Sequence, residues 1–325
     1  MAERVLITGA GGHIGGYLTA QLLSEGADVR AVDVKPADEW LQRYEDAENL
    51  TLDLRLREDC ERAVAGMSVA YNLACDMGGM GYIDEHKALC MLSVLINTQL
   101  LDASRGAGVE RFLFASSACV YAAGKQSVAE LEPLREQDAY PAEPQDGYGW
   151  EKLFGERMCR HFTEDFGLET RVVRYHNVYG PRGTFEGGRE KVPAAICRRV
   201  AEARLTGGGE IEIWGDGEQT RSFTYIDDCI EGTLAVMRGP SSEPLNVGSA
   251  ERVSINELAD IVEGIAGTSL ERTYDTSAPQ GVRGRNSDNT LVRKLTGWEP
   301  STSLEDGLRP TYAWIEEQVA ARIAA

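Results

Sequence analysis

A glycine-rich turn near the N-terminus constrains the fold of this chain more than any other feature. It follows a short apolar run at residues 4–8, and Gly9, Gly12 and Gly15 are spaced three residues apart. A β-branched run that ends at such a turn indicates a buried strand, and a helix is expected over about residues 13–24. Free N–H groups at the start of that helix, together with its dipole, suit a pyrophosphate. The spacing therefore predicts a dinucleotide-binding unit.

The residue that ends the next strand indicates which dinucleotide is bound. A second strand is expected over residues 28–32, and Asp33 follows it directly. A carboxylate at this position can accept both hydroxyls of a ribose and repels a 2′-phosphate, so it favours NAD over NADP. The alternative is that Asp33 is a solvated loop acid, and the nearby Lys35 leaves NADP open.

Strands and helices continue to alternate through the first half of the chain. Four further strands are expected over residues 50–54, 69–74, 111–115 and 168–175, with helices between them that include a long one over about 83–105. This alternation predicts an α/β fold with a Rossmann-type, doubly wound parallel sheet that binds ligands at the strand C-termini. Asp53 would then reach the adenine, and Ala74 would lie near the cofactor.

The second half of the chain is less regular and richer in glycine, proline and arginine. We expect an NAD-binding domain over residues 1–175 and a smaller α/β substrate-binding lobe over 176–325. Segments near 211–237 are expected to return to the first domain, and the final helix, about 304–323, is expected to be amphipathic.

Composition narrows the classes of partner and compartment. The chain has 325 residues and a net charge of −19, which argues against a nucleic acid or an anionic membrane as partner. Because the first strand begins by Arg4, no signal peptide is expected. The longest apolar run, residues 88–96, is too short to span a bilayer and is expected to be a buried helix segment.

The cysteines and histidines are scattered. Seven cysteines form no C-x-x-C pair, which indicates a reducing, cytoplasmic compartment and thiols that act as small hydrophobes, with Cys119 as the exception. The four histidines are scattered as well, so no metal site is assigned.

A Tyr-x-x-x-Lys pair supplies the first chemistry. Tyr148 and Lys152 lie one helical turn apart, so their side chains emerge on one face of a helix. An ammonium and a positive nicotinamide ring beside a phenol stabilise the phenolate and would lower a pKa that is ~10 in isolation. Ser117 can share the hydrogen-bonded hydroxyl. Taken alone, a Tyr-x-x-x-Lys pair is also common on protein surfaces without any function. Together with the glycine-rich turn and the upstream serine, it predicts nicotinamide hydride transfer.

Two further features point beyond plain hydride transfer. The thiol of Cys119 lies two residues after Ser117, and simple hydride transfer has no use for it. It indicates an enzyme that oxidises its substrate, moves a carbon-bound proton and reduces the product again. Around Lys191, a cluster of arginines stands out in an acidic chain; it is either a cationic helix start or a site for an anionic ligand such as a nucleotide-sugar diphosphate.

With these features the chain resembles the extended short-chain dehydrogenase/reductases and, within them, the GDP-mannose 3,5-epimerases. The stretches that carry this resemblance run nearly from end to end, and the most specific are Asp-Met-Gly-Gly-Met-Gly at 76–81 and Gly-Gly-Arg-Glu-Lys at 187–191. Others are 116–121, 141–149, 176–181, 219–223 and 281–288.

The resemblance implies an isomerase that epimerises GDP-mannose at C3 and C5 through a 4-keto sugar. The products would be GDP-L-galactose and, by inversion at C5 alone, GDP-L-gulose. Tyr148 would take the O4 proton while NAD takes the C4 hydride, and the ketone would acidify the hydrogens on C3 and C5. Cys119 and Lys191 would then be the acid–base pair that inverts those carbons. A homodimer is also implied.

The resemblance also implies which residues bind each ligand. The catalytic set is Tyr148, Lys152, Cys119, Lys191 and Ser117. The cofactor set is Gly9, Gly12, His13, Ile14, Gly15, Asp33, Asp53, Ala74, Tyr148 and Lys152. The substrate set is Gly78, Ser117, Ala118, Cys119, Asn177, Glu190, Lys191, Val192, Arg199, Gln219, Thr220, Arg221 and Arg285. Spacing does not decide whether Arg283 or Arg285 reaches the phosphate.

Departures from the family pattern leave alternatives open. His13 stands where an aromatic is usual, Cys75 replaces an alanine, and Trp150 replaces a leucine. A nucleotide-sugar 4-epimerase would leave Cys119 and Lys191 without a role, and a 4,6-dehydratase would want a carboxylate pair at 118–119. A non-catalytic NAD-sensing protein would have little reason to keep the tyrosine and the lysine.

Overall fold

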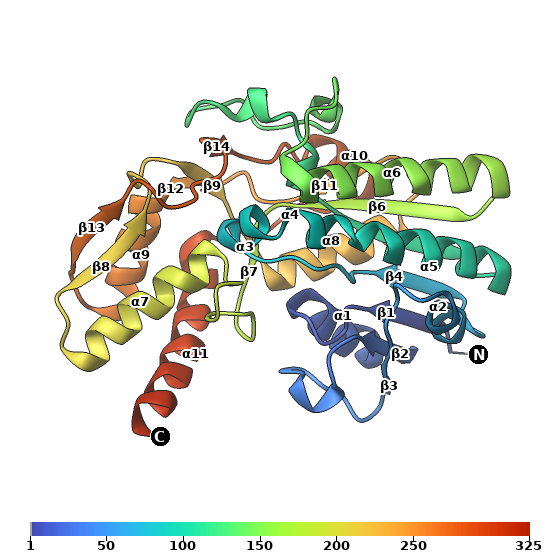
Figure 1. Ribbon diagram of the computed structural model, residues 1–325, viewed down its shortest axis with the longest axis horizontal. Helices are drawn as coiled ribbons and strands as arrows, with labels where there is room; N and C mark the ends of the chain where they lie inside the picture. The colour runs from blue at the N-terminus through green and yellow to red at the C-terminus, as the bar shows by residue number, and fades with distance from the viewer. Residues whose placement is uncertain (1) are drawn as a thin grey trace.

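A seven-stranded parallel sheet forms the centre of the larger lobe (Figure 1). The computed structural model describes residues 2–325. The strand order is β11-β6-β5-β4-β1-β2-β3, and every neighbouring pair is parallel. The strands are β1 (Arg4–Thr8), β2 (Asp28–Asp33), β3 (Glu48–Thr51), β4 (Val69–Asn72), β5 (Arg111–Ser117), β6 (Glu169–Tyr175) and β11 (Leu245–Val247). The order reverses between β1 and β4, so a crevice opens at their C-terminal ends. The predicted fold class is confirmed.

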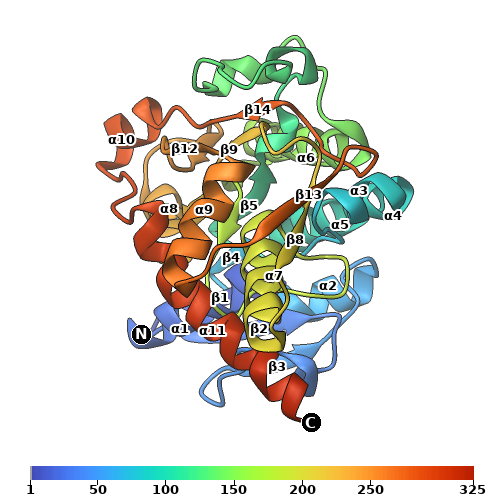
Figure 2. The same ribbon diagram turned by 90° about the vertical axis from the view of Figure 1, so that its left-hand side faces the viewer.

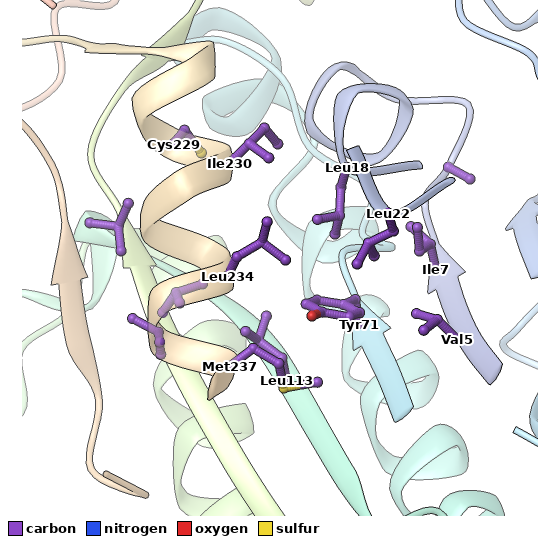
Figure 3. Close-up of a cluster of buried hydrophobic side chains, with 14 of the residues drawn as sticks. Val5, Ile7, Leu18, Leu22, Tyr71, Leu113, Cys229, Ile230, Leu234 and Met237 are labelled. Carbon is purple, nitrogen blue, oxygen red and sulfur yellow. The ribbon is translucent and has the colours of Figure 1, made fainter. Parts of the chain in front are cut away.

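Helices bury both faces of this sheet, as a parallel sheet requires. Successive side chains of a strand point to opposite faces. Val5 and Ile7 therefore pack beneath α1 (His13–Ser24) and α8 (Ile226–Arg238), and Figure 3 shows Leu18 and Leu22 of α1 facing Ile230 and Leu234 of α8 across Tyr71. Leu6 points the other way, into a core shared with α2 (Arg57–Val64), α5 (Ser93–Ala107) and α6 (Asp146–Phe166).

A second core lies in the smaller lobe, on the left of Figure 1 and facing the viewer in Figure 2. Ile196, Val262 and Ile315 are among its members, and they come from α7 (Val192–Thr206), α9 (Ile255–Ala266) and α11 (Leu304–Ala324). The strands of this lobe are short: β7 (Val178–Tyr179) with β10 (Thr224–Tyr225), β8 (Glu210–Trp214) with β13 (Glu271–Asp275), and β9 (Thr220–Ser222) between β12 (Arg252–Ser254) and β14 (Gly284–Arg285). Helix α10 (Thr290–Thr296) packs beside β11 and α8.

The long helix expected over residues 83–105 is wrong, because the structure has three helices there. They are α3 (Met80–Glu85), α4 (Lys87–Met91) and α5. His86 separates α3 from α4 with the non-helical angles φ −122° and ψ 38°. Its ring stacks on that of Tyr82 with 4.3 Å between the ring centres, and its Nδ1 lies 3.1 Å from the Tyr82 carbonyl oxygen. The helix therefore ends at His86, where the local pattern favours its continuation.

The apolar run at residues 88–96 is also not buried as expected. Leu89, Met91, Leu92 and Leu95 are 41–47% exposed. Trp150 and Phe154 of the adjacent helix α6 are 48% and 49% exposed, and α6 packs against both α4 and α5. Leu89 and Leu92 line the cavity described below, whereas Met91, Leu95, Trp150 and Phe154 are exposed outside it on α4, α5 and α6. Among residues 2–325, no helix combines the length and the apolar content needed to cross a bilayer.

Strands β3 and β4 end earlier than expected. β3 stops at Thr51 and β4 at Asn72, so Asp53 and Ala74 lie in the loops that follow these strands. Both still lie at the C-terminal edge of the sheet, where the cavity described below opens.

Candidate active site

The glycine-rich turn is shaped by close contacts of its backbone. Gly9 has φ +71°, and a Cβ on it would lie 2.9 Å from the Leu73 carbonyl carbon. A Cβ on Gly15 would lie 2.2 Å from the Gly9 carbonyl oxygen, so the helix start can approach the turn only through glycine. Gly12 caps α1 without any side-chain hydrogen bond, which leaves the first N–H groups of the helix for a ligand.

Asp33 lies beside this turn at the end of β2. Its carboxylate accepts hydrogen bonds from the N–H groups of Gly11 and Lys35, both at 3.0 Å. These contacts fix the carboxylate at the cavity wall, where its remaining lone pairs suit a ribose diol. The ammonium of Lys35 donates to the Gly11 carbonyl oxygen at 2.6 Å, so it is already engaged with the main chain. Asp53 lines the same cavity and forms an ion pair with Arg55 at 2.6 Å.

The catalytic triplet predicted from the sequence comes together at the N-terminal end of α6. Ser117 ends β5, and its hydroxyl lies near the Tyr148 phenol and accepts a hydrogen bond from the Cys119 N–H at 3.2 Å. Lys152 lies one turn further along α6, with its ammonium 5.5 Å from the centre of the Tyr148 ring. Lys152 is buried behind the tyrosine and does not itself line the cavity. Phe114 holds it from the other side, with 4.9 Å between the ammonium and the ring centre.

The protein's own groups shift the pKa of Tyr148 upward, whereas the sequence predicted a lowered value. Burial is the main cause, and the neighbouring Cys75 and Cys119 add to it, while the Ser117 hydroxyl acts in the opposite direction. For Lys152, burial lowers the pKa, but Cys75 and Glu151 more than offset it, so the net shift is upward. The Glu151 carboxylate lies 3.4 Å from the Lys152 ammonium. Lys152 therefore stays cationic beneath the phenol.

Cys119 and Lys191 lie on the same cavity, from opposite lobes. Cys119 sits in a short 3-10 turn after β5, and Lys191 caps the start of α7. Burial lowers the pKa of Lys191, and the nearby Cys119 acts against this shift. The pKa of His13 falls to about 4, chiefly because of burial, and the positive charge of Lys191 lowers it further. His13 is thus neutral, and its Nε2 lies 3.0 Å from the Pro181 carbonyl oxygen.

Buried arginines without carboxylate partners make part of the cavity cationic. Arg221 donates to main-chain carbonyl oxygens of Thr220, Gln280 and Val282 at 2.6–3.0 Å, and its pKa is lowered to about 9 by burial and by Arg285. Two such guanidiniums close together favour an anionic ligand. Arg283 instead forms a 2.7 Å ion pair with Asp216 at the surface and does not line the cavity.

The two most specific motifs pack against each other. The Gly79 N–H donates to the Arg189 carbonyl oxygen at 3.0 Å, and a Cβ on Gly79 would lie 2.3 Å from the Glu190 carbonyl oxygen. The Arg189 guanidinium donates to Asp76 at 2.8 Å and to the Tyr82 hydroxyl at 2.6 Å. The two motifs therefore fix each other's position, and Lys191 directly follows Arg189 and Glu190, which make these contacts.

Nearly all predicted site residues line a single cavity of about 880 Å³. The exceptions are Lys152, which lies behind Tyr148, and Thr220, whose hydroxyl donates to the Ala129 carbonyl oxygen. Asn177 lines it with φ +45°, and its amide donates to the Ser222 carbonyl oxygen at 2.9 Å. The predicted members that line it are Gly9, Gly12, His13, Ile14, Gly15, Asp33, Asp53, Ala74, Gly78, Ser117, Ala118, Cys119, Tyr148, Asn177, Glu190, Lys191, Val192, Arg199, Gln219, Arg221 and Arg285.

Among the cavity residues that were not given a role from the sequence, three contact predicted site residues. Cys75, which we expected to act as a small hydrophobe, lines the cavity and hydrogen-bonds Lys152. Gln145 contacts Arg285 at 2.8 Å, and Trp214 lies over the Arg199 guanidinium at 5.7 Å. Gln145 belongs to the stretch 141–149, which carries the family resemblance and was the available signal, whereas Cys75 is a departure from the family pattern.

A comparison with protein families matches residues 5–248 to the NAD dependent epimerase/dehydratase family. The chain belongs to this family. GDP-mannose 3,5-epimerase 1 of Oryza sativa subsp. japonica is 47% identical over 317 residues, which are 97% of this chain and 82% of that protein. The family confirms the predicted dependence on NAD, and the glycine-rich turn and Asp33 fit that cofactor.

Solved structures of nucleotide-sugar epimerases share the whole fold of this epimerase/dehydratase. UDP-glucose 4-epimerase of Thermotoga maritima, solved with UDP-glucose, has a TM-score of 0.87 at 27% identity, and the match covers 97% of this chain and 99% of that one. UDP-glucose 4-epimerase of Thermus thermophilus, solved with NAD, has a TM-score of 0.82 at 25% identity over 96% and 98%.

Proposed function

We propose that this chain epimerises GDP-mannose at C3 and C5 through a 4-keto sugar, giving GDP-L-galactose and, by inversion at C5 alone, GDP-L-gulose. The observation that carries the proposal is that one cavity holds two distinct acid–base groups. Tyr148, Ser117 and Lys152 form the first, and Cys119 and Lys191 form the second. The match to the rice GDP-mannose 3,5-epimerase supports the choice of sugar nucleotide.

The first group serves the oxidation and reduction at C4. NAD, when bound, supplies a reversible acceptor for the C4 hydride and a positive charge next to Tyr148. Tyr148 takes the proton of the C4 hydroxyl and later returns it. Lys152 favours the phenolate, and Ser117 holds the hydroxyl by a hydrogen bond. Burial raises the pKa of Tyr148 in the protein alone, so an added positive charge beside the phenol favours the phenolate.

The second group serves the inversions. A C4 ketone acidifies the hydrogens on C3 and C5, because the electron pair left on either carbon delocalises onto the ketone oxygen. One of Cys119 and Lys191 removes a proton, and the other delivers a proton to the opposite face. Burial lowers the pKa of Lys191, so the amine reaches its neutral, basic form more readily than an exposed lysine. Arg199, Arg221 and Arg285 supply positive charge for the diphosphate.

Incubation with GDP-mannose in D₂O tests the proposal most directly. We expect NMR spectra to show GDP-L-galactose and GDP-L-gulose with deuterium on the inverted carbons and none introduced at C4, because the C4 hydrogen leaves and returns as hydride. UDP-glucose is the matched control nucleotide sugar and should remain unchanged. Inversion at C4 without deuterium incorporation would instead support a nucleotide-sugar 4-epimerase.

We expect the purified protein to retain NAD, since a hydride acceptor that is regenerated in each turnover gains nothing by leaving. Nucleotide released by heat should be NAD or NADH, because Asp33 disfavours a 2′-phosphate. Chromatography of the released nucleotide against standards measures this. Recovery of mainly NADP would contradict the role given to Asp33.

We further propose a homodimer that covers the apolar side chains exposed on α4, α5 and α6. Leu95 of α5 and Phe154 of α6 lie outside the cavity and are 41% and 49% exposed. Contiguous apolar surface of this kind favours burial in an interface. We expect Leu95→Glu and Phe154→Glu to reduce the solution mass to one 35.5 kDa chain, as measured by light scattering. Ile323→Glu, on the exposed end of α11, is the control. A wild-type protein that is already monomeric would refute the proposal.

The division into lobes and the compartment stay proposals. We place the NAD-binding domain at residues 1–175 and the nucleotide-sugar lobe at 176–325. Of the 211–237 segment, α8 packs beneath the large sheet, whereas β8 pairs with β13 in the smaller lobe. The seven free cysteines are consistent with a reducing, cytoplasmic location.

A further inference from the structure

Arg285 is a buried cation whose three hydrogen-bond acceptors carry no formal charge. Its side chain donates from Nε to Gln126 Oε1 at 2.7 Å, from Nη2 to Gln145 Oε1 at 2.8 Å and from Nη1 to the Cys119 Sγ at 3.5 Å. Only 5% of the residue is exposed. A buried guanidinium usually needs a carboxylate to offset the loss of hydration. The positive charge of Arg285 is therefore not cancelled where it meets the thiol.

A second buried arginine shows that this chain does build the usual arrangement elsewhere. Arg174 is 2% exposed, and both of its contacts to Glu156, at 2.8 and 2.7 Å, are to carboxylate oxygens. The bidentate carboxylate satisfies charge and hydrogen bonds together. At Arg285 the same geometry is provided by two amide oxygens, which orient the guanidinium without neutralising it.

The two glutamines are themselves held in place. The amide of Gln126, fully buried, donates to the main-chain oxygens of Tyr121 and Ala122 at 3.1 and 3.4 Å, so its oxygen faces Arg285. The main-chain N–H of Gln145 donates to the Cys119 carbonyl oxygen at 2.9 Å. Gln145 thus binds both the cysteine backbone and the guanidinium, and it fixes the position of one relative to the other.

We propose that Gln126 and Gln145 are positioning residues that hold Arg285 against Cys119, so that its charge favours the thiolate over the thiol. An adjacent cation stabilises a thiolate over a thiol. The other ionisable groups that face Cys119 are Lys191, Arg221 and Tyr148, from three different elements. In the proposed reaction, on which the role of the thiolate rests, it accepts a proton from a sugar carbon and becomes a thiol. The pair of electrons left on that carbon moves toward the C4 ketone.

Alkylation of Cys119 by iodoacetamide tests this without any sugar. The reagent is uncharged, reacts with thiolates, and its product on the Cys119 peptide is read by mass spectrometry over a series of pH values. Gln145→Glu keeps the side-chain shape but places a carboxylate on Arg285. We expect it to slow alkylation of Cys119 about tenfold at pH values where most of the thiol is protonated, because the thiolate would then form at a pH higher by about 1. Gln126→Met, which removes the acceptor for Nε, should slow it in the same direction.

Two controls separate this effect from a change in shape or access. Cys75 lines the same cavity, so its alkylation in the same samples reports access. Gln137→Glu adds the same charge at an exposed position and should match the wild-type rate. Cys119 rates within twofold of wild type in both Gln145→Glu and Gln126→Met would overturn the proposal, as would an equal slowing of Cys75. A chain that acts on a different sugar would leave these rates unaffected, so the two proposals can fail separately.

Discussion

Tyr148→Phe is expected to stop every step of the reaction, including the formation of NADH. The phenol is the group placed to take the proton of the C4 hydroxyl, with Ser117 beside it and the ammonium of Lys152 beneath it. Removing a positioned acid or base costs on the order of 10²–10⁴ in rate. Both absorbance at 340 nm after mixing with GDP-mannose and deuterium incorporation in D₂O should fall by at least this factor.

A matched variant distinguishes this effect from the loss of any hydroxyl. Tyr140→Phe removes the same atom from an exposed tyrosine that does not line the cavity, and it should retain wild-type rates. Bound NAD should also be retained in Tyr148→Phe, because the glycine-rich turn and Asp33 are unchanged. If Tyr148→Phe forms NADH at the wild-type rate, another group takes the O4 proton and the assignment is wrong.

The parts of the fold that were predicted closely are those in which local patterns decide the outcome. The strand at residues 4–8, the turn at Gly9 to Gly15 and the helix at 13–24 have the expected bounds. In this segment a buried strand is followed by a turn that needs glycine and then by the start of a helix. Each of these features is determined by residues that are close in sequence. Tyr148 and Lys152 likewise share a helix face because of helical spacing alone.

What was missed is not encoded in a hydrophobic pattern. The helix break at His86 is a local departure of the backbone, with φ −122° and ψ 38°. The exposure of Leu95 could not be read from composition, because a buried core and an interface select the same side chains. The contact between Arg285 and Cys119 joins residues that are 166 positions apart. Family resemblance named both residues, but only the fold brings them together.

The upward shift in the pKa of Tyr148 was missed for a related reason. Spacing places a lysine near the tyrosine, but it carries no information about the depth of the pocket. Burial disfavours the charged phenolate, and the thiols of Cys75 and Cys119 lie close enough to add to that cost. The sequence thus predicts which groups meet, while the balance between an attractive charge and lost hydration requires the packed structure.

Cys119→Ala and Lys191→Ala are expected to separate the redox chemistry from the inversions. Each variant leaves Tyr148, Ser117 and Lys152 in place, so oxidation at C4 should still give transient NADH absorbance. Each lacks one member of the pair that moves carbon-bound protons, so deuterium incorporation and inverted sugar should fall by about 10²–10⁴. Stopped-flow absorbance measures the first quantity, and NMR in D₂O measures the second.

The controls for this pair remove the same functional groups elsewhere. Cys197→Ala deletes a thiol from the core of the smaller lobe, and Lys294→Ala deletes an exposed ammonium; both should keep inversion. The two site variants need not be equal, because the acid and the base act on opposite faces of the sugar. If both still give deuterated, inverted sugar at near wild-type rates, Cys119 and Lys191 are not the acid–base pair. Another acid–base group of the cavity would then have to move the carbon-bound protons.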